Sequence, residues 1–441
     1  MIASKTAAVI GAGWSGLAAA LVLARAGRRV TVFEASRNLG GRARSVTFGD
    51  GPDDAGGEEG QRLDNGQHIL IGAYRETLRL MRVAGVDVNR ALLRLPLDLH
   101  YADGFRMRAA RLPYPFNLVS ALLGCKAIGK AEALAAMRMM TLLQLRRFQV
   151  APDVTVSAFL ARHRQSDMLR SHLWEPLCIS ALNTPPHLAS AQVFANVLRD
   201  GLTGRRENSD LLVPRIDLGR LFPEPAAERL RAMGAKVELG TAIRQIRRRG
   251  SRFALDDREG EYSTVVVAVA PQHAGALLAG MIELQQARSR IDELAYEPIV
   301  TCYQQYSADV VLPSPMLGFS GGLLQWAFDR GQLGNARHAG LIAAVISASG
   351  IHDDIPNDIL GSRVAEEIAA VTGRSESPLW SRVITEKRAT WSCRPGVVRP
   401  AMRTALPGLL LAGDYIEGDY PGTLEAAARN GLAAARAALE G

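Results

Sequence analysis

The stretch Ala7-Ala8-Val9-Ile10-Gly11-Ala12-Gly13-Trp14-Ser15-Gly16 decides the fold of this chain. Its apolar residues predict a strand that runs into a G-x-G-x-x-G turn, and we expect a helix after the turn. Gly11 makes the tight turn, Gly13 lets a pyrophosphate approach the backbone, and Gly16 lets helix and strand pack closely. The N-terminus of the helix then directs backbone amides and a partial positive charge at the phosphates. The stretch therefore predicts a dinucleotide site in an α/β fold.

An acidic residue at the end of the next strand supports this reading. The strand expected from Arg29 to Phe33 ends at Glu34. An acid about 20 residues after the first glycine typically accepts hydrogen bonds from a ribose hydroxyl. Because a carboxylate repels a 2′-phosphate, NADP fits this site poorly. NAD and FAD both remain open at this point.

Two further runs favour FAD over NAD. Gly40-Gly41-Arg42-Ala43-Arg44-Ser45 follows the acid, and Leu409-Leu410-Leu411-Ala412-Gly413-Asp414 ends a strand near the other end of the chain. Both resemble runs of the flavin amine oxidase and phytoene desaturase superfamily. The resemblance implies that Arg42 lies along the adenosine and pyrophosphate, and that Asp414 bonds the cofactor near the pyrophosphate and ribityl chain. We therefore expect an FAD site built from both ends of the chain.

The full set of expected FAD contacts follows these motifs. It comprises Gly11, Gly13, Trp14, Ser15, Gly16, Glu34, Ala35, Gly40, Gly41, Arg42, Asn65, Gly66, Gln67, His68, Val237, Gly413, Asp414, Thr423 and Leu424.

The composition is that of a folded protein. The 441 residues are 48% hydrophobic and 22% charged, and the length favours two domains. The formal net charge of +8 suits nucleic acid, an anionic membrane surface or an anionic substrate, or reflects composition alone. Because the chain has no recognised nucleic-acid motif, we do not expect a nucleic-acid partner.

The four cysteines are far apart in the sequence and include no C-x-x-C pair; they are Cys125, Cys178, Cys302 and Cys393. This usage predicts neither a metal site nor a disulfide framework, and it fits a reducing compartment. The glycine motif starts at residue 11, so we expect no signal peptide. No apolar run reaches about 18 residues, so we expect no spanning helix. The expected location is cytoplasmic.

The order of expected elements divides the chain into two discontinuous domains. A Rossmann-like α/β domain that binds FAD is expected from residues 1–75, 211–271 and 395–441. A discontinuous α+β domain that binds the substrate is expected from residues 76–210 and 272–394. The Gly- and acid-rich insert at residues 49–60 is predicted to be a solvated loop.

Residues 113–148 combine many leucines and methionines with basic side chains. The basic residues stand against one acid, Glu132; they are Lys126, Lys130, Arg138, Arg146 and Arg147. Two interpretations stay open: a buried helix, or a helix that touches a bilayer or walls a lipid-sized tunnel. The second interpretation predicts a peripheral protein on the inner face of the cell membrane.

Four runs narrow the resemblance within the superfamily. They are Asp64-Asn65-Gly66-Gln67-His68, Gln325-Trp326-Ala327-Phe328-Asp329-Arg330, Glu386-Lys387-Arg388-Ala389-Thr390, and Ala412-Gly413-Asp414 with Thr423-Leu424-Glu425-Ala426-Ala427. Together they resemble the hydroxysqualene dehydroxylases, squalene-associated FAD-dependent enzymes of bacterial hopanoid synthesis. The resemblance spans nearly the whole chain. It implies reductive removal of a hydroxyl, in which hydroxysqualene loses water and accepts hydride to give squalene.

Such a reaction needs a reduced flavin, an acid that protonates the departing hydroxyl, and a long apolar cavity. His68 is the first candidate acid because a histidine titrates near neutral pH and because its run is expected beside the isoalloxazine ring. Tyr420 and Glu425 are the reserves. Each of these three residues also has a purely structural interpretation, in which it contacts the cofactor, the backbone or neighbouring side chains without taking part in the reaction. The aromatic residues expected to wall the cavity are Trp326, Phe328 and Trp391.

Two departures from the superfamily disfavour amine oxidation. Amine oxidases carry a lysine near flavin N5 on a strand that aligns with residues 297–306, where this chain has none. Their aromatic-cage tyrosine aligns with Thr423. No cysteine matches a covalent flavin link, so we expect non-covalent FAD.

Other functions stay open. A carotenoid-type desaturase would act on a similar lipid in the opposite redox direction, and a non-catalytic flavoprotein would only carry a polyprenyl lipid. The electron donor is also open, because the chain has one dinucleotide fingerprint. Either a nicotinamide visits transiently or another protein donates electrons.

Overall fold

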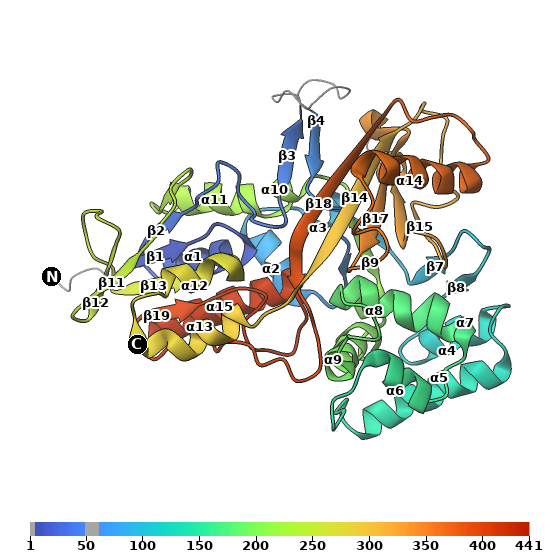
Figure 1. Cartoon of the computed structure of the whole chain (residues 1–441), viewed down its shortest axis with the longest axis horizontal. Coiled ribbons are helices and arrows are strands. Elements are labelled where there is room, and N and C mark those ends of the chain that lie inside the picture. Colours follow the sequence, from blue (N-terminus) through green and yellow to red (C-terminus); the bar gives the residue numbers. More distant parts are fainter. Residues whose placement is uncertain (1–4, 49–60, 335, 441) are drawn as a thin grey trace.

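The computed structural model describes residues 5–48, 61–334 and 336–440. Figure 1 shows a sheet beside both chain termini, a second sheet at the opposite end, and a cluster of helices below that second sheet. The long strands β14 and β18 run between the two ends of the molecule. The predicted loop at residues 49–60 lies outside the described residues.

The first sheet is parallel and is assembled from distant parts of the chain. Its strands, in spatial order, are β10 (Lys236–Glu238), β2 (Arg29–Phe33), β1 (Thr6–Ile10), β13 (Thr264–Val267) and β19 (Leu409–Leu411). Val9 lies opposite Val32 on one side and Val266 on the other. The predicted α/β fold with a strand, a glycine turn and a helix at the N-terminus is therefore confirmed.

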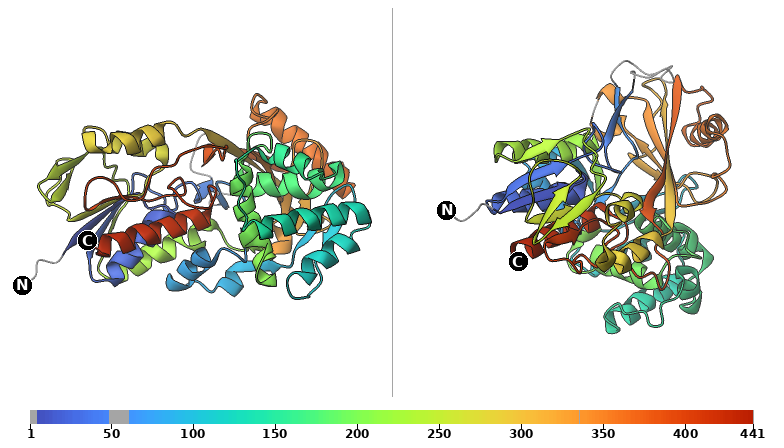
Figure 2. Two further views of the ribbon diagram at one scale, coloured as in Figure 1. Left: turned by 90° about the horizontal axis from the view of Figure 1, so that it is seen from below. Right: turned by 60° about the vertical axis from the view of Figure 1, so that its left-hand side comes forward.

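Helices cover both faces of this sheet (Figure 2). Successive side chains of a strand point to opposite faces, and the buried residues of β1 follow this rule. Ala7 and Val9 share one core with α1 (Trp14–Arg25), α11 (Pro223–Ala232) and α15 (Leu424–Glu440). Ala8 and Ile10 share the other core with α12 (Pro271–Leu277) and α13 (Gln285–Asp292). The two-domain division stays a prediction. Because α12 and α13 pack on the first sheet, we propose that the domain built around this sheet extends to residue 292.

The second sheet is antiparallel. Its order is β15 (Met316–Gly318), β16 (Trp326–Asp329), β17 (Leu341–Ser347), β14 (Tyr296–Gln305) and β18 (Trp380–Trp391). Helix α14 (Asn357–Thr372) packs on one face. The other face carries Tyr303, Phe328 and Val345, which pack with Leu63 and Val213. This face lies toward the domain built around the first sheet, and its inward side chains reach the site described below.

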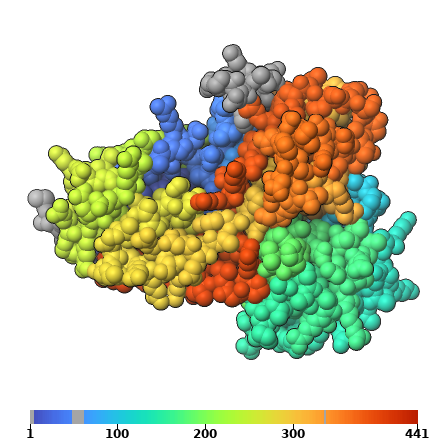
Figure 3. Space-filling view, in the orientation of Figure 1, coloured from blue at the N-terminus to red at the C-terminus, as the bar shows by residue number. Residues whose placement is uncertain are grey.

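A helical lobe stands below the second sheet, and Figure 3 shows it in green below the orange lobe. It contains α4 (Phe116–Gly124), α5 (Lys130–Leu145), α6 (Val156–Arg162), α7 (Asp167–Leu169), a π-helix (Arg170–Trp174), α8 (Glu175–Leu182) and α9 (Ala191–Leu202). Residues 113–148 thus form two helices that are buried on one side and exposed on the other. In the part of the chain that the structure describes, no helix is long and apolar enough to cross a bilayer.

Shorter elements connect these three parts. They are β3 (Ser45–Phe48), β4 (Gln61–Asp64), β5 (Leu70–Ile71), α2 (Arg75–Val83), α3 (Val88–Ala91), β6 (Leu92–Leu95), β7 (Asp98–His100), β8 (Arg106–Arg108), β9 (Leu211–Pro214), α10 (Leu218–Leu221), β11 (Ile246–Arg249) and β12 (Arg252–Leu255). All four cysteines are free and buried, which agrees with the prediction of no disulfide framework.

Candidate functional site

A cavity of about 800 Å³ begins at the carboxyl ends of the first sheet and continues to the inner face of the second. Ligands of open α/β sheets bind at that end of the strands. Seventeen of the predicted FAD contacts line the cavity: Gly11, Gly13, Trp14, Ser15, Glu34, Ala35, Gly40, Gly41, Arg42, Asn65, Gly66, Gln67, His68, Gly413, Asp414, Thr423 and Leu424. Both ends of the chain therefore meet at one site.

The glycine turn has the backbone that its sequence requires. Gly11 has φ +105°, and a Cβ there would stand 2.6 Å from the carbonyl oxygen of Ala268. A Cβ on Gly16 would overlap the carbonyl oxygen of Gly11, so Gly16 serves the packing of α1 on β1 and lies outside the cavity lining. The N-cap residue of α1 is Gly13, which has no side chain to cap the first amides of the helix. The buried Ser15 Oγ has no hydrogen-bond partner. Free amides and an unpartnered hydroxyl at a helix N-terminus fit the pyrophosphate of FAD.

The carboxylate of Glu34 is held at the edge of this turn. Its two oxygens accept hydrogen bonds from Ala12 N at 2.7 Å and Ser36 N at 2.9 Å. Glu34 also lines the cavity, so an anionic acceptor stands where a contact to a ribose hydroxyl would need one. Val237 lies in β10 opposite Val32 and does not line the cavity.

An ion pair joins the two ends of the chain. Arg42 Nη2 contacts Asp414 Oδ1, and Arg42 Nη1 donates to the carbonyl of Ala389 at 2.9 Å. Burial opposes the charge on Arg42, but the attraction and hydrogen bond of Asp414 outweigh it and raise the arginine pKa. Three motif runs thereby meet at one wall of the cavity.

His68 lines the cavity next to this wall. Its Nδ1 lies 2.8 Å from the carbonyl oxygen of Gly66. Because a carbonyl only accepts, Nδ1 carries the proton of the neutral ring and Nε2 keeps a lone pair. Burial lowers the pKa of His68, and the bond to Gly66 offsets this only in part. The ring is therefore mostly neutral near pH 7.

The segment that carries His68 is tied to the second sheet. Arg330 Nη1 donates to Gln67 Oε1 at 2.9 Å, and Gln67 N donates to Thr301 Oγ1 at 3.3 Å. The arginine shares its buried region with Asp64, whose pKa is raised by burial and lowered by Arg330, to about 6 overall. Arg330 and Thr301 were not among the predicted site residues. The runs that contain Gln67 and Arg330 both carry the family resemblance, but no residue of either run indicates that these two side chains form a hydrogen bond.

The far end of the cavity is largely apolar. Two of the residues predicted to wall a substrate cavity, Trp326 and Phe328, are in its lining, together with Ile299 and Val345. Helix α8 adds Ser180 and Ala181, and Asn183 follows the helix. No sequence signal marked this helix, because its cavity residues belong to no motif. Trp391 lies outside the lining: it is buried, and its Nε1 donates to the carbonyl of Asp414 at 3.2 Å.

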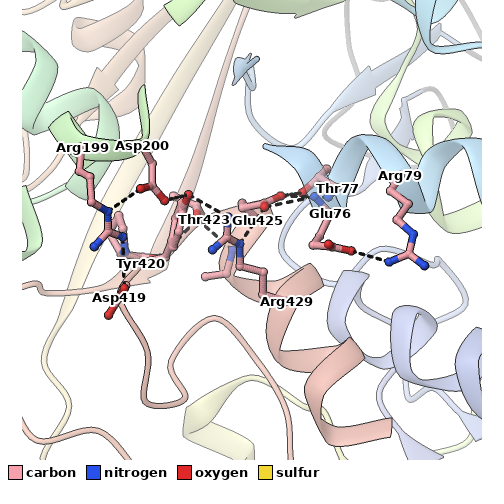
Figure 4. A network of polar contacts seen from close by, with 12 residues as sticks. Glu76, Thr77, Arg79, Arg199, Asp200, Asp419, Tyr420, Thr423, Glu425 and Arg429 are labelled. Atoms are coloured by element: carbon pink, nitrogen blue, oxygen red, sulfur yellow. Dashed lines mark hydrogen bonds and ion pairs between the residues drawn. The ribbon is translucent and has the colours of Figure 1, made fainter. Parts of the chain in front are cut away.

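Tyr420 and Glu425 belong to a separate polar network (Figure 4). The Tyr420 hydroxyl bonds Asp200, and Arg429 Nη2 donates to Tyr420 at 3.1 Å. Glu425 is fully buried and accepts from Arg429 Nε at 2.8 Å and from the amide and hydroxyl of Thr77 at 2.9 and 2.8 Å. The network links α15, α9 and α2. Neither residue lines the cavity, so neither enters the mechanism proposed below.

Comparisons with known proteins agree with this geometry. Residues 14–439 match the family of flavin containing amine oxidoreductases. A hydroxysqualene dehydroxylase of Rhodopseudomonas palustris is 30% identical, over 98% of this chain and 98% of its own. A carotenoid phi-ring synthase of Streptomyces griseus is 27% identical, over 98% and 87%. The solved structure of a putrescine oxidase mutant has a TM-score of 0.73 at 18% identity, with 99% of each chain covered, which shows a shared fold.

Proposed function

We propose that this chain, which belongs to the flavin containing amine oxidoreductase family, removes the hydroxyl of hydroxysqualene reductively to give squalene. It is an FAD-dependent oxidoreductase. The resemblance to hydroxysqualene dehydroxylases noted in its motif runs is confirmed by the full-length similarity to such an enzyme.

One observation carries the proposal: a single cavity contains both the dinucleotide turn and an apolar end. Gly11 and Glu34 lie at one end, and Phe328 and Val345 at the other. A polyprenyl chain suits the apolar end because its transfer from water to an apolar wall is favourable. His68 lies in the same lining, so one cavity offers a cofactor site, an apolar wall and a titratable group.

The protein's contribution is orientation, exclusion of water and a proton. Bound FAD, when reduced, supplies the hydride. Protonated His68 gives a proton from Nε2 to the departing hydroxyl, which leaves as water when the C–O bond breaks. The carbonyl of Gly66 supports the imidazolium through Nδ1. Ile299, Phe328 and Val345 keep water away from the carbon that loses its hydroxyl.

A carotenoid-type desaturase is the second candidate. The similarity to a carotenoid phi-ring synthase favours it, because that relative also covers nearly the whole chain. Amine oxidation stays disfavoured, since β14 carries no lysine between Tyr296 and Gln305. A nicotinamide and a protein are the two candidate electron donors to the flavin.

We also propose that the helical lobe meets an anionic membrane. On α5, Leu134, Arg138 and Leu145 are exposed and recur at helical spacing, so they share one face. On α4, Phe116 and Leu123 are exposed one heptad apart. The exposed fractions reach 63% for Phe116 and 75% for Leu145.

The two faces are adjacent at one end. The hydroxyl of Tyr114, just before α4, contacts Gln144 near the end of α5. Phe116 and Leu145 are close in sequence to these two residues, and so are the exposed basic residues Arg111, Arg146 and Arg147. Apolar side chains with a basic surround fit an anionic bilayer surface, which is where a squalene-sized substrate resides.

The direction of the redox reaction tests the proposed function. The FAD-loaded enzyme is reduced with dithionite without oxygen and mixed with hydroxysqualene, and in a second arm the oxidised enzyme is mixed with squalene. We expect flavin reoxidation and squalene formation in the first arm only. Formation of a more unsaturated product in the second arm would instead identify a desaturase. No change of the lipid in either arm would favour a carrier.

A further inference from the structure

Two polar side chains of the cavity lining, Asn183 and Ser180, differ in how they are bonded. Asn183 uses both ends of its amide: Nδ2 donates to Thr390 Oγ1 at 3.0 Å, and Oδ1 accepts from Ala348 N at 2.7 Å. Ser180 differs, because its hydroxyl lies on the exposed, cavity-facing side of α8.

An indole fixes the hydroxyl of Ser180. Trp326 Nε1 donates to Ser180 Oγ at 2.9 Å, although the two residues are far apart in sequence. Because the serine oxygen accepts this bond, its own proton is available to donate to a ligand. The indole is itself held in place: it packs on Tyr101 with ring centroids 5.5 Å apart, and a Cβ on Gly318 would stand 2.9 Å from it.

The strand register brings this hydroxyl toward the segment of His68. Trp326 lies opposite Val345, and Val345 lies opposite Thr301. Thr301 in turn bonds Gln67 N. Two strand spacings separate Trp326 from Thr301, or about 10 Å between Cα atoms. Ser180 and His68 line the same cavity, so one substrate can lie against both side chains.

We infer that Ser180 Oγ, oriented by Trp326, is the binding site for the hydroxyl oxygen of the substrate. The inference rests on the proposed function and specifies how the site recognises an alcohol on an otherwise apolar chain. The serine donates to the alcohol oxygen, so a hydrocarbon of the same length gains nothing from it. Ser180 thereby favours the hydroxylated substrate over the product, which promotes product release.

The test compares an alcohol and a hydrocarbon in FAD-loaded enzyme. Dissociation constants for hydroxysqualene and for squalene are measured from the change in flavin absorbance, with Ser180→Ala, Trp326→Phe and the matched control Ser362→Ala. Ser362 is also an exposed serine on a helix, α14, and it lies outside the cavity lining. Loss of one neutral hydrogen bond weakens binding roughly 3- to 10-fold.

Ser180→Ala should weaken the binding of hydroxysqualene by that factor. It should leave the dissociation constant of squalene within about twofold of the wild-type value. Trp326→Phe keeps an aromatic ring but frees the serine to rotate, so it should produce a smaller loss for the alcohol. Ser362→Ala should change the binding of neither ligand. The inference is overturned if Ser180→Ala weakens the binding of both ligands equally, or if it does not weaken the binding of the alcohol.

The binding arms also separate this inference from the proposed function. If wild-type enzyme forms no squalene but still prefers the alcohol through Ser180, the alcohol site stands and the reaction assignment fails. If squalene forms normally in Ser180→Ala with unchanged affinity, the reaction stands and the alcohol site fails.

Discussion

Arg330 donates a hydrogen bond to Gln67 across 2.9 Å, and both side chains are buried, with exposed fractions of 4% and 8%. The bond joins the second sheet to the run that carries His68. Gln67 also donates from Nε2 to the carbonyl of His68 at 3.1 Å. The position of His68 in the cavity therefore depends on a contact between two distant motif runs.

Gln67→Leu should slow single-turnover flavin reoxidation more than the control variant does, beyond what its loss of thermal stability explains. It removes the acceptor of a charged donor, and such hydrogen bonds contribute roughly 1.5–3 kcal/mol. Thermal unfolding and single-turnover flavin reoxidation are the measurements. Gln304→Leu is the matched control, because Gln304 is also buried, in β14, with its Nε2 bonded to Gly361 at 2.8 Å, and lies outside the cavity lining. Equal losses of turnover in both variants would mean that the Arg330 contact only stabilises the fold.

Glu34→Ala should weaken FAD binding and leave the chemical step unchanged once the site is saturated. A hydrogen bond from a ribose hydroxyl to a carboxylate is worth roughly 1.5–3 kcal/mol, which corresponds to about one to two decades in affinity. Titration of apoprotein with FAD measures the dissociation constant. Glu238→Ala is the control, since Glu238 lies on the neighbouring strand β10 outside the lining. An unchanged constant for Glu34→Ala would rule out the ribose contact.

The pH profile tests His68 as the proton donor. Burial lowers its pKa below 6.5 and the bond to Gly66 offsets this only in part, so the protonated, active form grows as the pH falls. With the flavin reduced beforehand, turnover should rise from pH 8 toward pH 5. Pre-reduction removes the unknown electron donor from the measured step.

His68→Gln should retain FAD, lose this pH dependence and slow turnover by about 10²–10⁴, the usual worth of general acid catalysis. His273→Gln is the control, because His273 is exposed at the dinucleotide end of the same cavity. A His68 variant that turns over at the wild-type rate would reduce the residue to a cofactor contact.

The exposed face of the helical lobe should bind anionic vesicles. Co-sedimentation with phosphatidylglycerol vesicles should fall as salt is added, because screening weakens the attraction of the basic residues. A Phe116→Ser, Leu145→Ser double variant should sediment less at every salt concentration. Ile351→Ser is the control for exposed apolar area, since Ile351 is 79% exposed in another part of the molecule. Loss of sedimentation with Ile351→Ser alone would place the membrane contact elsewhere.

The sequence by itself determined the dinucleotide end of the site. Gly11 and Gly16 permit a turn that other residues would obstruct, and Glu34 follows at the spacing set by one helix and one strand. These are local properties of the backbone, so spacing along the chain is enough to predict them. The runs around Arg42 and Asp414 added the other end of the chain by resemblance, and the structure brings them into contact.

Only the tertiary structure decided which side chains face the cavity. Glu425 and Trp391 lie in motif-bearing or neighbouring segments, yet Thr77 and the carbonyl of Asp414 engage them away from the lining. Ser180 lies in no motif, and it reaches the cavity because α8 packs beside the second sheet and Trp326 bonds its hydroxyl. In residues 113–148, helical spacing fits a buried helix and a membrane-facing helix equally well, and only the packing of α4 and α5 shows which face is exposed. The physical reason is common to all three cases: a side chain's direction depends on partners distant in sequence, and local spacing carries no information about them.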